Sequence, residues 1–521
     1  MLADRETLVE RGPSTLASQL GPAKLKIIWL LLTVWLAAFG GALLFAARNW
    51  PMVQDAPILI YMGFLTEHGM RLYRDVTEVQ FPGSVLLYSF GRHVFGSSDA
   101  GFRMFDLCAL AVAFAAMMAI ARRSGYWFAG VFGFAFFLWS QKGVKLSIIN
   151  LGQRDFFISC MLGVGIACLI EALRRDEPRL LAVFGFCVAF GASIKPMAVL
   201  FVLPVVIVLL EMRRRERPLA PYLGWTTAGV AAGTALVIGF LLWKHALGAF
   251  IHVELRYIPL YVDIKYRTFR QMFRQLIDPP RMLLPLLAIC GAGLVLFQRQ
   301  LRQDREQQVL MLCALLGAAA FLLQHKGFDY HRAPFLFFFY LWAGWVLVGT
   351  MLHGRRELGW AALALTALAV ASYPHLREKS TYDMWMIDTL QSDLTALHAA
   401  DKPGEMQCLD TTFGCTTVAL RMKAVTATGY TTDYLLFLDK HDPRLDELRQ
   451  DFLSRFEAAK PRLVVLTNQQ WPKTLDYGYD ELAAWPEFKR RLNDEYTLTL
   501  ERGGTEEHGR GYRIYTRKAA L

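Results

Sequence analysis

Apolar and polar positions divide this chain into two unequal parts. From about Lys26 to Tyr373, apolar runs close to the ~20 residues that cross a bilayer as a helix recur between short polar connections. After Tyr373 these runs stop, and shorter amphipathic patterns replace them. The pattern predicts a polytopic α-helical membrane protein that ends in a soluble C-terminal domain.

The apolar runs predict eleven transmembrane helices, at 26–47, 103–121, 126–140, 156–172, 179–193, 196–211, 222–243, 281–298, 308–324, 333–352 and 358–373. We therefore divide the chain into a polar N-terminal segment (1–25), a transmembrane domain (26–373) and a soluble domain (374–521). The transmembrane domain contains a large loop at 48–102. In this loop, apolar residues from Ile58 to Leu65 have the spacing of a helix that lies in the membrane interface, and a second helix follows from Leu86 to Phe95.

The C-terminal part is predicted to be a small α/β domain. Residue types favour strands at 405–409, 417–420, 462–467, 496–500 and 512–516, and helices at 442–459 and 487–493. Asp442 is a suitable N-cap for the longer helix, with Pro443 at its first position. Cys408 and Cys415 either form a disulfide on an oxidising side of the membrane or remain two buried thiols.

Basic residues indicate how the chain crosses the membrane. With eleven spans, the short basic loops all fall on one side: 122–123, 174–179, 213–217, 299–305 and 355–356. Lys and Arg are retained in cytoplasmic loops. We therefore expect a multi-pass protein of the bacterial inner membrane, with a cytoplasmic N-terminus and a periplasmic C-terminal domain.

Composition agrees with this topology and limits the partners. Hydrophobic residues make up 54% of the chain and charged residues 19%, which is too little charge to coat a soluble protein of this size. The net charge of +11 would suggest nucleic-acid binding in a soluble protein. Here the basic cytoplasmic loops account for it, so we expect contact with the lipid bilayer and none with nucleic acid.

Acidic residues on the predicted outer side are candidates for catalysis. Asp55 follows the first span by about eight residues, Asp75 and Glu78 lie further along the same loop, and Asp155 opens the fourth span. Each also has a structural interpretation. Asp55 and Asp155 could cap helices, and Asp75 could form a turn or an ion pair with Arg74.

Cationic residues on the same side are candidates for binding phosphate. Arg154 and Lys195 lie at the ends of apolar runs, where a charge is costly unless it faces a cavity or a partner. The polar segment 324–334 adds Lys326, Arg332, Tyr330 and His331. Arg and Lys bind phosphate well. No metal-ligand spacing is present, and a divalent cation is left open.

Several short motifs resemble the GT-C superfamily of membrane glycosyltransferases. They are Asp55 after the first span, Tyr73-Arg74-Asp75, Phe81-Pro82, the stretch from Phe95 to Arg103, Lys195-Pro196 and the segment 326–334. Their order is most similar to the branch of protein O-mannosyltransferases and the lipid A aminoarabinose transferase. One departure is Ala56, where many relatives have a second acid. The resemblance implies a GT-C-like fold, Asp55 as a catalytic base, and Asp155 or Glu78 as its partner acid.

The implied activity is transfer of a monosaccharide from a polyprenyl-phosphate donor to a hydroxyl acceptor, with inversion at the anomeric carbon. The sugar could be a hexose or a pentose, and the acceptor a lipid, a glycan or a protein. A transporter or flippase for lipid-linked sugars is the alternative, but it predicts internal repeats that the sequence does not show. A non-catalytic membrane scaffold would leave the polar residues of the outer side unexplained.

Overall fold

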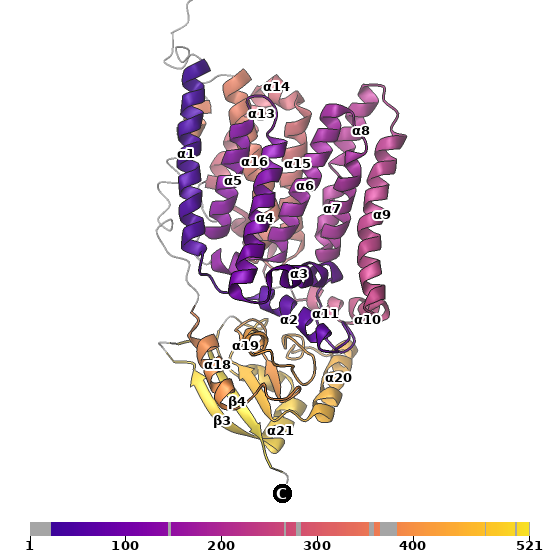
Figure 1. Cartoon of the computed structure of the whole chain (residues 1–521), viewed down its shortest axis with the longest axis vertical. Coiled ribbons are helices and arrows are strands. Elements are labelled where there is room, and N and C mark those ends of the chain that lie inside the picture. The colour runs from indigo at the N-terminus through magenta and orange to yellow at the C-terminus, as the bar shows by residue number, and fades with distance from the viewer. Residues whose placement is uncertain are drawn as a thin grey trace, which may run out of the picture.

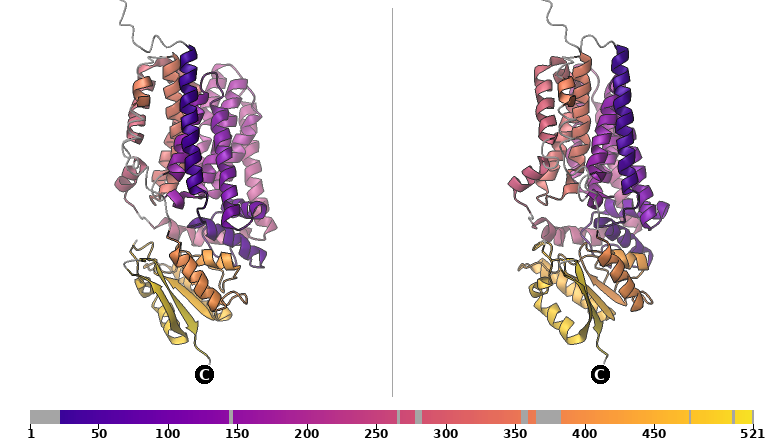
Figure 2. Two further views of the ribbon diagram at one scale, coloured as in Figure 1. Left: turned by 60° about the vertical axis from the view of Figure 1, so that its left-hand side comes forward. Right: turned by 90° about the vertical axis from the view of Figure 1, so that its left-hand side faces the viewer.

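The computed structural model describes residues 22–143, 147–264, 267–277, 283–353, 359–364, 383–474, 476–505 and 508–519. A bundle of long helices forms one half of the molecule, and an α/β domain is stacked on one end of it (Figure 1). Short helices lie across that end, between the bundle and the domain (Figure 2). The predicted fold class is confirmed.

Helices occupy ten of the eleven predicted spans, and the eleventh, 358–373, lies largely outside the described residues. These helices are α1 (Pro22–Ala47), α4 (Asp99–Ile120), α5 (Trp127–Lys142), α6 (Arg154–Arg175), α7 (Leu180–Ile194), the 3-10 helix η3 (Pro196–Val202) with α8 (Val205–Arg214), α9 (Ala220–Trp243), α13 (Leu283–Phe297), α15 (Arg305–Leu323) and α16 (Ala333–His353). By length and apolar composition alone, 7 helical stretches of the described chain could cross a membrane. The multi-pass assignment therefore stands.

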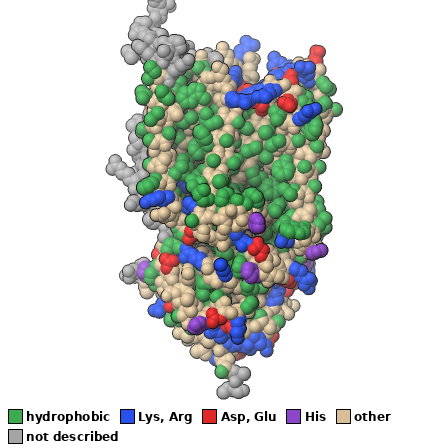
Figure 3. All heavy atoms as spheres, viewed as in Figure 1, with side chains coloured by type: hydrophobic (Ala, Val, Ile, Leu, Met, Phe, Trp, Pro, Cys, Tyr) green, Lys and Arg blue, Asp and Glu red, His purple; other side chains and the backbone are tan. Residues whose placement is uncertain are grey.

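Packing within the bundle follows from the apolar character of each helix. α16 is buried almost throughout and forms the centre, whereas α1 is mostly exposed at the edge. Exposed large side chains such as Leu31, Trp35 and Trp243 face outward. The space-filling view shows a broad apolar surface on the visible face of the bundle (Figure 3). Apolar side chains exposed over such an area are suited to lipid.

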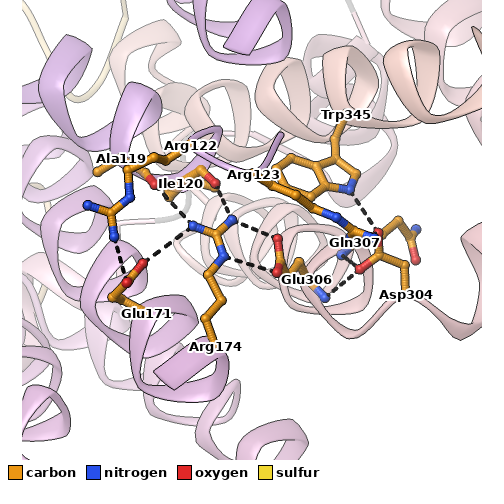
Figure 4. A network of polar contacts seen from close by, with 10 residues as sticks. All are labelled: Ala119, Ile120, Arg122, Arg123, Glu171, Arg174, Asp304, Glu306, Gln307 and Trp345. Carbon is orange, nitrogen blue, oxygen red and sulfur yellow. Dashed lines mark hydrogen bonds and ion pairs between the residues drawn. The ribbon is translucent and has the colours of Figure 1, made fainter. Parts of the chain in front are cut away.

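Charged side chains gather at the end of the bundle away from the α/β domain (Figure 3). The basic loops predicted to share one side meet there, as far as they are described. Arg174 on α6 reaches Glu306 on α15, with an Nη2–Oε2 distance of 2.7 Å (Figure 4). Arg123 reaches Asp304, with an Nη1–Oδ2 distance of 2.7 Å. The short α14 (Arg299–Gln303) completes this end.

The other end of the bundle is covered by α2 (Asp55–Glu67), α3 (Pro82–Phe95), α10 (Leu247–Arg256), α11 (Ile258–Val262) and α12 (Phe269–Ile277). The helices predicted in the 48–102 loop are confirmed, and the first of them packs between the bundle and the α/β domain. α2 is buried continuously from Ala56 to Leu65 because the α/β domain lies over it. The Tyr61 hydroxyl donates to the Ala424 carbonyl of that domain at 2.7 Å.

The α/β domain contains one four-stranded sheet in the order β1-β2-β4-β3. β1 (Met406–Leu409) pairs parallel with β2 (Leu463–Thr467), and β4 (Gly511–Arg517) pairs antiparallel with β2 and with β3 (Tyr496–Gly503). The helices are α18 (Trp385–Ala396), α19 (Cys415–Met422), α20 (Pro443–Ala459) and α21 (Pro486–Glu495). Asp442 caps α20 as predicted, accepting from the Arg444 amide at 3.0 Å.

The strand predicted at 417–420 is wrong, because this segment lies in α19. The Asp410 carboxylate accepts hydrogen bonds from the amides of Phe413, Gly414 and Cys415, at 2.8–2.9 Å. These amides at the beginning of a helix otherwise have no partner, so the carboxylate favours helix over strand. A disulfide joins Cys408 at the end of β1 to Cys415 at the start of α19.

Candidate active site

A cavity of about 790 Å³ lies where the bundle meets the α/β domain. The bundle side, which we call the floor, includes Asp55, Arg154, Lys195 and Lys326. The α/β domain supplies the opposite side, which we call the roof, through Thr411, Thr412, Phe413, Thr432, Tyr434, Gln469, Gln470, Trp471, Thr474, Asp476, Tyr477 and Arg510. This volume is within the range of about 300–1,000 Å³ that is usual for small-molecule sites.

Asp55 lies on the floor at the beginning of α2 and is paired with Arg154 at the beginning of α6. The distance from Arg154 Nη2 to Asp55 Oδ2 is 3.1 Å, and both side chains are mostly buried. The other terminal nitrogen of Arg154 donates to the side chain of Gln80. An anionic oxygen is therefore held in a fixed direction at the cavity surface, which suits a general base.

Asp155 forms the second floor pair, with Lys195 between α7 and η3. Lys195 Nζ lies 2.7 Å from Asp155 Oδ2. Lys195 lines the large cavity, whereas Asp155 lies behind it and lines a smaller pocket together with His331. Burial lowers the pKa of Lys195 to about 8, although Asp155 opposes this shift. Asp155 thus positions a cation rather than presenting its own carboxylate to the cavity.

Glu78 also lines the cavity, and its carboxylate is held by the α/β domain. The hydroxyls of Thr431 and Thr432 donate to its Oε2 at 2.9 and 2.5 Å. Burial raises the pKa of Glu78, and these hydrogen bonds oppose the shift. These two hydrogen bonds join the loop of the bundle to the α/β domain, so the geometry of Glu78 suits attachment of the domain.

The segment 324–334 divides between the cavity and the interior. Lys326 and Tyr330 line the cavity, and Lys326 Nζ donates to the backbone carbonyls of Tyr261, at 2.6 Å, and Ile264. Burial lowers the pKa of Lys326 to about 8. Arg332 turns inward, and its Nη1 donates to the Gln275 carbonyl at 2.8 Å. The structure does not bring Arg332 or His331 to the cavity wall.

Two comparisons relate this chain to known proteins, one with a family model and one with solved structures. Residues 82–324 match the model of glycosyltransferase family 87. The structure of ArnT from Cupriavidus metallidurans bound to undecaprenyl phosphate is 12% identical, with a TM-score of 0.53, over 93% of this chain and 98% of that one. Its apo structure is 11% identical, with a TM-score of 0.51, over 94% and 98%. This chain has the GT-C fold of membrane glycosyltransferases. A comparison with curated protein sequences finds no match.

In the Tyr73-Arg74-Asp75 motif, Asp75 does not line the cavity. Asp75 is partly exposed and pairs with Arg71 and Arg74, at 3.4 and 3.7 Å. Tyr73 has a more direct connection to the site, because its hydroxyl donates to the Gln80 carbonyl at 2.5 Å. The motif backbone also binds the α/β domain.

Arg455 on α20 forms this contact between the motif and the α/β domain of the GT-C fold. Its guanidinium donates to the carbonyls of Asp75 at 2.7 Å and Arg74 at 2.6 Å. A second link joins Arg421 on α19 to Asp99 at the start of α4, with an Nη2–Oδ2 distance of 3.1 Å. The α/β domain is therefore fastened to the bundle around the cavity.

The roof is the part of the site that the sequence did not predict. Its polar and aromatic side chains include Thr411, Thr412, Tyr434, Gln469, Gln470 and Trp471. The last three follow directly after β2, and the end of a central strand is the one signal that could have pointed to them. On the floor, Gln80 and Glu254 were also missed.

Within the described residues, no group of three or more His, Cys, Asp and Glu side chains is placed to hold a metal ion. The divalent cation left open from the sequence therefore stays untested. The arrangement present instead combines a carboxylate with three buried cations at the membrane end of the cavity. Such a site can accept a proton and stabilise a developing anion.

Proposed function

We propose that this protein transfers a monosaccharide from a polyprenyl-phosphate donor to a hydroxyl group of a lipid, glycan or protein, with inversion at the anomeric carbon. One observation carries the proposal: the Asp55 carboxylate, oriented by Arg154, faces a cavity at the edge of the membrane domain. The similar ArnT structure holds undecaprenyl phosphate, which supports a lipid-phosphate donor.

The reaction assigns a role to each floor residue. Asp55 removes the proton from the acceptor hydroxyl while its oxygen attacks the anomeric carbon. The bond from this carbon to the phosphate oxygen breaks, and the electron pair leaves with the lipid phosphate. Arg154, Lys195 and Lys326 lower the energy of that departing charge. A phosphate stabilised in this way needs no strong general acid.

The outer face of the inner membrane is the side we assign to the cavity. The disulfide Cys408–Cys415 lies in the domain that forms the roof, and disulfides persist in oxidising compartments. The basic loops lie at the opposite end of the bundle, as expected for a cytoplasmic face. Nucleotide sugars are cytoplasmic, so an enzyme facing outward requires a sugar carried on a lipid.

The test is transfer from radiolabelled polyprenyl-phosphate sugars to envelope acceptors, using full-length protein in membranes. Asp55→Asn keeps the shape of the side chain but removes the base. We expect it to lower the rate by about 10²–10⁴-fold. Asp401→Asn is the matched control, because Asp401 is exposed and lies outside the cavity. Transfer that persists in Asp55→Asn would exclude Asp55 as the base, and no transfer by wild type would contradict the proposal.

A further inference from the structure

One short helix at the cavity end of the bundle exposes a row of large apolar side chains. α12 lies at the side of the bundle, near the α/β domain, and packs against α15 (Figure 2). Its contact side is apolar, because Met272 and Leu276 are buried. Phe269, Phe273 and Ile277 follow one another at intervals of four residues and are 58%, 50% and 36% exposed. They therefore form one apolar stripe on the surface, and such a patch marks a site of interaction.

A basic stripe runs beside the apolar one on α12. Arg270 and Arg274 each follow a phenylalanine of the apolar stripe in the sequence, so they lie about 100° further around the helix axis. Both side chains are exposed, and neither forms an ion pair with an acidic side chain in the described part of the chain. An exposed apolar stripe beside a basic one is typical of a helix that lies in the membrane interface.

The hydrogen bonds of Gln275 fix α12 at the level where the bundle ends. Its Nε2 donates to Asp329 Oδ1 at 2.7 Å, and its carbonyl accepts from Arg332 Nη1 at 2.8 Å. Asp329 and Arg332 belong to the 3-10 helix η4, which directly precedes α16 at the centre of the bundle. The apolar stripe of α12 therefore lies at the edge of the apolar surface that the bundle presents to lipid.

The position of the two arginines favours the bilayer itself as the partner of α12. Arg270 and Arg274 do not line the cavity, so a phosphate bound by them would lie outside the site that we assign to the donor. Phospholipid surrounds the bundle at this level and carries both chemical groups that α12 can bind. Its acyl chains match the apolar stripe, and its phosphate matches the guanidinium groups.

We propose that α12 inserts Phe269, Phe273 and Ile277 into the membrane surface and binds the headgroup of an anionic phospholipid through Arg270 and Arg274. A zwitterionic headgroup also carries a phosphate, but its ammonium group weakens the attraction of an arginine. Each basic side chain near an anionic membrane surface adds to the strength of binding, so this helix should prefer anionic lipid. The contact goes beyond the proposed transfer reaction and does not depend on it.

Photocrosslinking tests this contact without an assay of transfer. Full-length protein is placed in nanodiscs that contain phosphatidylglycerol and phosphatidylcholine in equal amounts, and one lipid at a time carries the same photoreactive acyl chain. Mass spectrometry then measures the label on residues 268–277. Wild-type protein should be labelled at least about fivefold more by phosphatidylglycerol than by phosphatidylcholine. The double variant Arg270→Gln, Arg274→Gln should lose this preference, and Phe273→Gln should lower labelling by both lipids.

The matched control is Lys489→Gln with Arg490→Gln, which removes the same charge from exposed positions on α21 in the α/β domain. It should be labelled like wild type. Equal labelling of wild-type α12 by the two lipids, no label on α12, or a preference that survives in the arginine double variant would each overturn the inference. Label that added polyprenyl phosphate displaces at a small fraction of the phosphatidylglycerol concentration would assign the arginines to the donor, which also overturns it. All of these outcomes leave the proposed function standing, because none measures transfer.

Discussion

Ion pairs occur at both ends of the helical bundle, but their cations are satisfied to different extents. At the end with the basic loops, Arg174 donates to both oxygens of Glu306, at 3.0 and 2.7 Å, and also to the carbonyls of Ala119 and Ile120 (Figure 4). At the cavity end, Arg154 binds Asp55 and Gln80, and its Nε has no hydrogen-bond partner in the described part of the chain.

This difference separates a structural network from a site. The contacts of Arg174 join α4, α6 and α15, and they leave little of its guanidinium for another molecule. Arg154 is buried at a cavity wall, where a phosphate can still approach its charge. A buried cation with remaining capacity gains more from an incoming anion than one whose donors are all used.

The largest expected effect comes from replacing Arg154 and Arg174 by Lys, because the first change should lower kcat and the second should lower the melting temperature. Arg154→Lys keeps the charge but loses the planar group that holds Asp55 and Gln80 together. We expect kcat to fall about 100-fold with a small change in melting temperature. Arg174→Lys should lower the melting temperature and leave kcat almost unchanged, because the hydrogen bonds that it loses connect three helices. Assays of transfer and thermal unfolding in detergent measure both, and equal effects of the two variants would contradict the comparison.

Removing the acid at the basic end is expected to have a smaller effect, limited to stability. Glu306→Gln keeps the shape of the side chain but weakens its two hydrogen bonds from Arg174. The free energy of unfolding should fall by about 1–3 kcal/mol, and the melting temperature by several degrees. Activity below the melting temperature should stay within about twofold of wild type. A loss of kcat in folded protein would show that this network takes part in the reaction.

Donor binding at the cavity end should depend on pH. Burial lowers the pKa values of Lys195 and Lys326 to about 8, so both side chains are cationic below that pH and lose their charge above it. Binding of the donor phosphate should therefore weaken as pH rises through about 8, with KM for the donor rising several-fold. In Lys195→Arg and Lys326→Arg the side chain remains cationic above pH 8. In each variant KM for the donor should therefore rise less with pH than in the wild type. An unchanged pH profile in both variants would exclude these lysines from binding phosphate.

The sequence predicted the floor better than the roof for physical reasons. Charged residues stand out at the ends of apolar runs because a membrane tolerates them only where they are paired or solvated, which identified Arg154, Asp155 and Lys195. Asp55 lies in a loop beyond the first span, and the resemblance to the GT-C superfamily identified it. Gln470 and Trp471 are ordinary residues in a soluble domain, and only the folded chain brings them over the floor. The helical spans were predictable because each helix satisfies its own backbone within the membrane.

Predictions from residue type failed where a particular side-chain contact or turn decides the structure. The β-branched residues from Thr416 to Val418 favour a strand, but hydrogen bonds to the Asp410 carboxylate begin a helix there. In the segment 324–334, the short 3-10 turn η4 (Asp329–Arg332) carries Arg332 inward to the Gln275 carbonyl. Residue type alone does not reveal which side of such a turn each side chain occupies.

The smallest expected effect concerns Asp75, whose place in the Tyr73-Arg74-Asp75 motif suggested a role in the site. Its partners Arg71 and Arg74 are exposed, and exposed ion pairs contribute about 0–1 kcal/mol. Asp75→Asn should therefore change kcat and KM by less than about threefold. Tyr73→Phe should have the larger effect of the two, because it removes the hydroxyl that holds Gln80, which in turn holds Arg154. A loss of activity in Asp75→Asn as large as that in Asp55→Asn would mean that this loop moves into the cavity during the reaction.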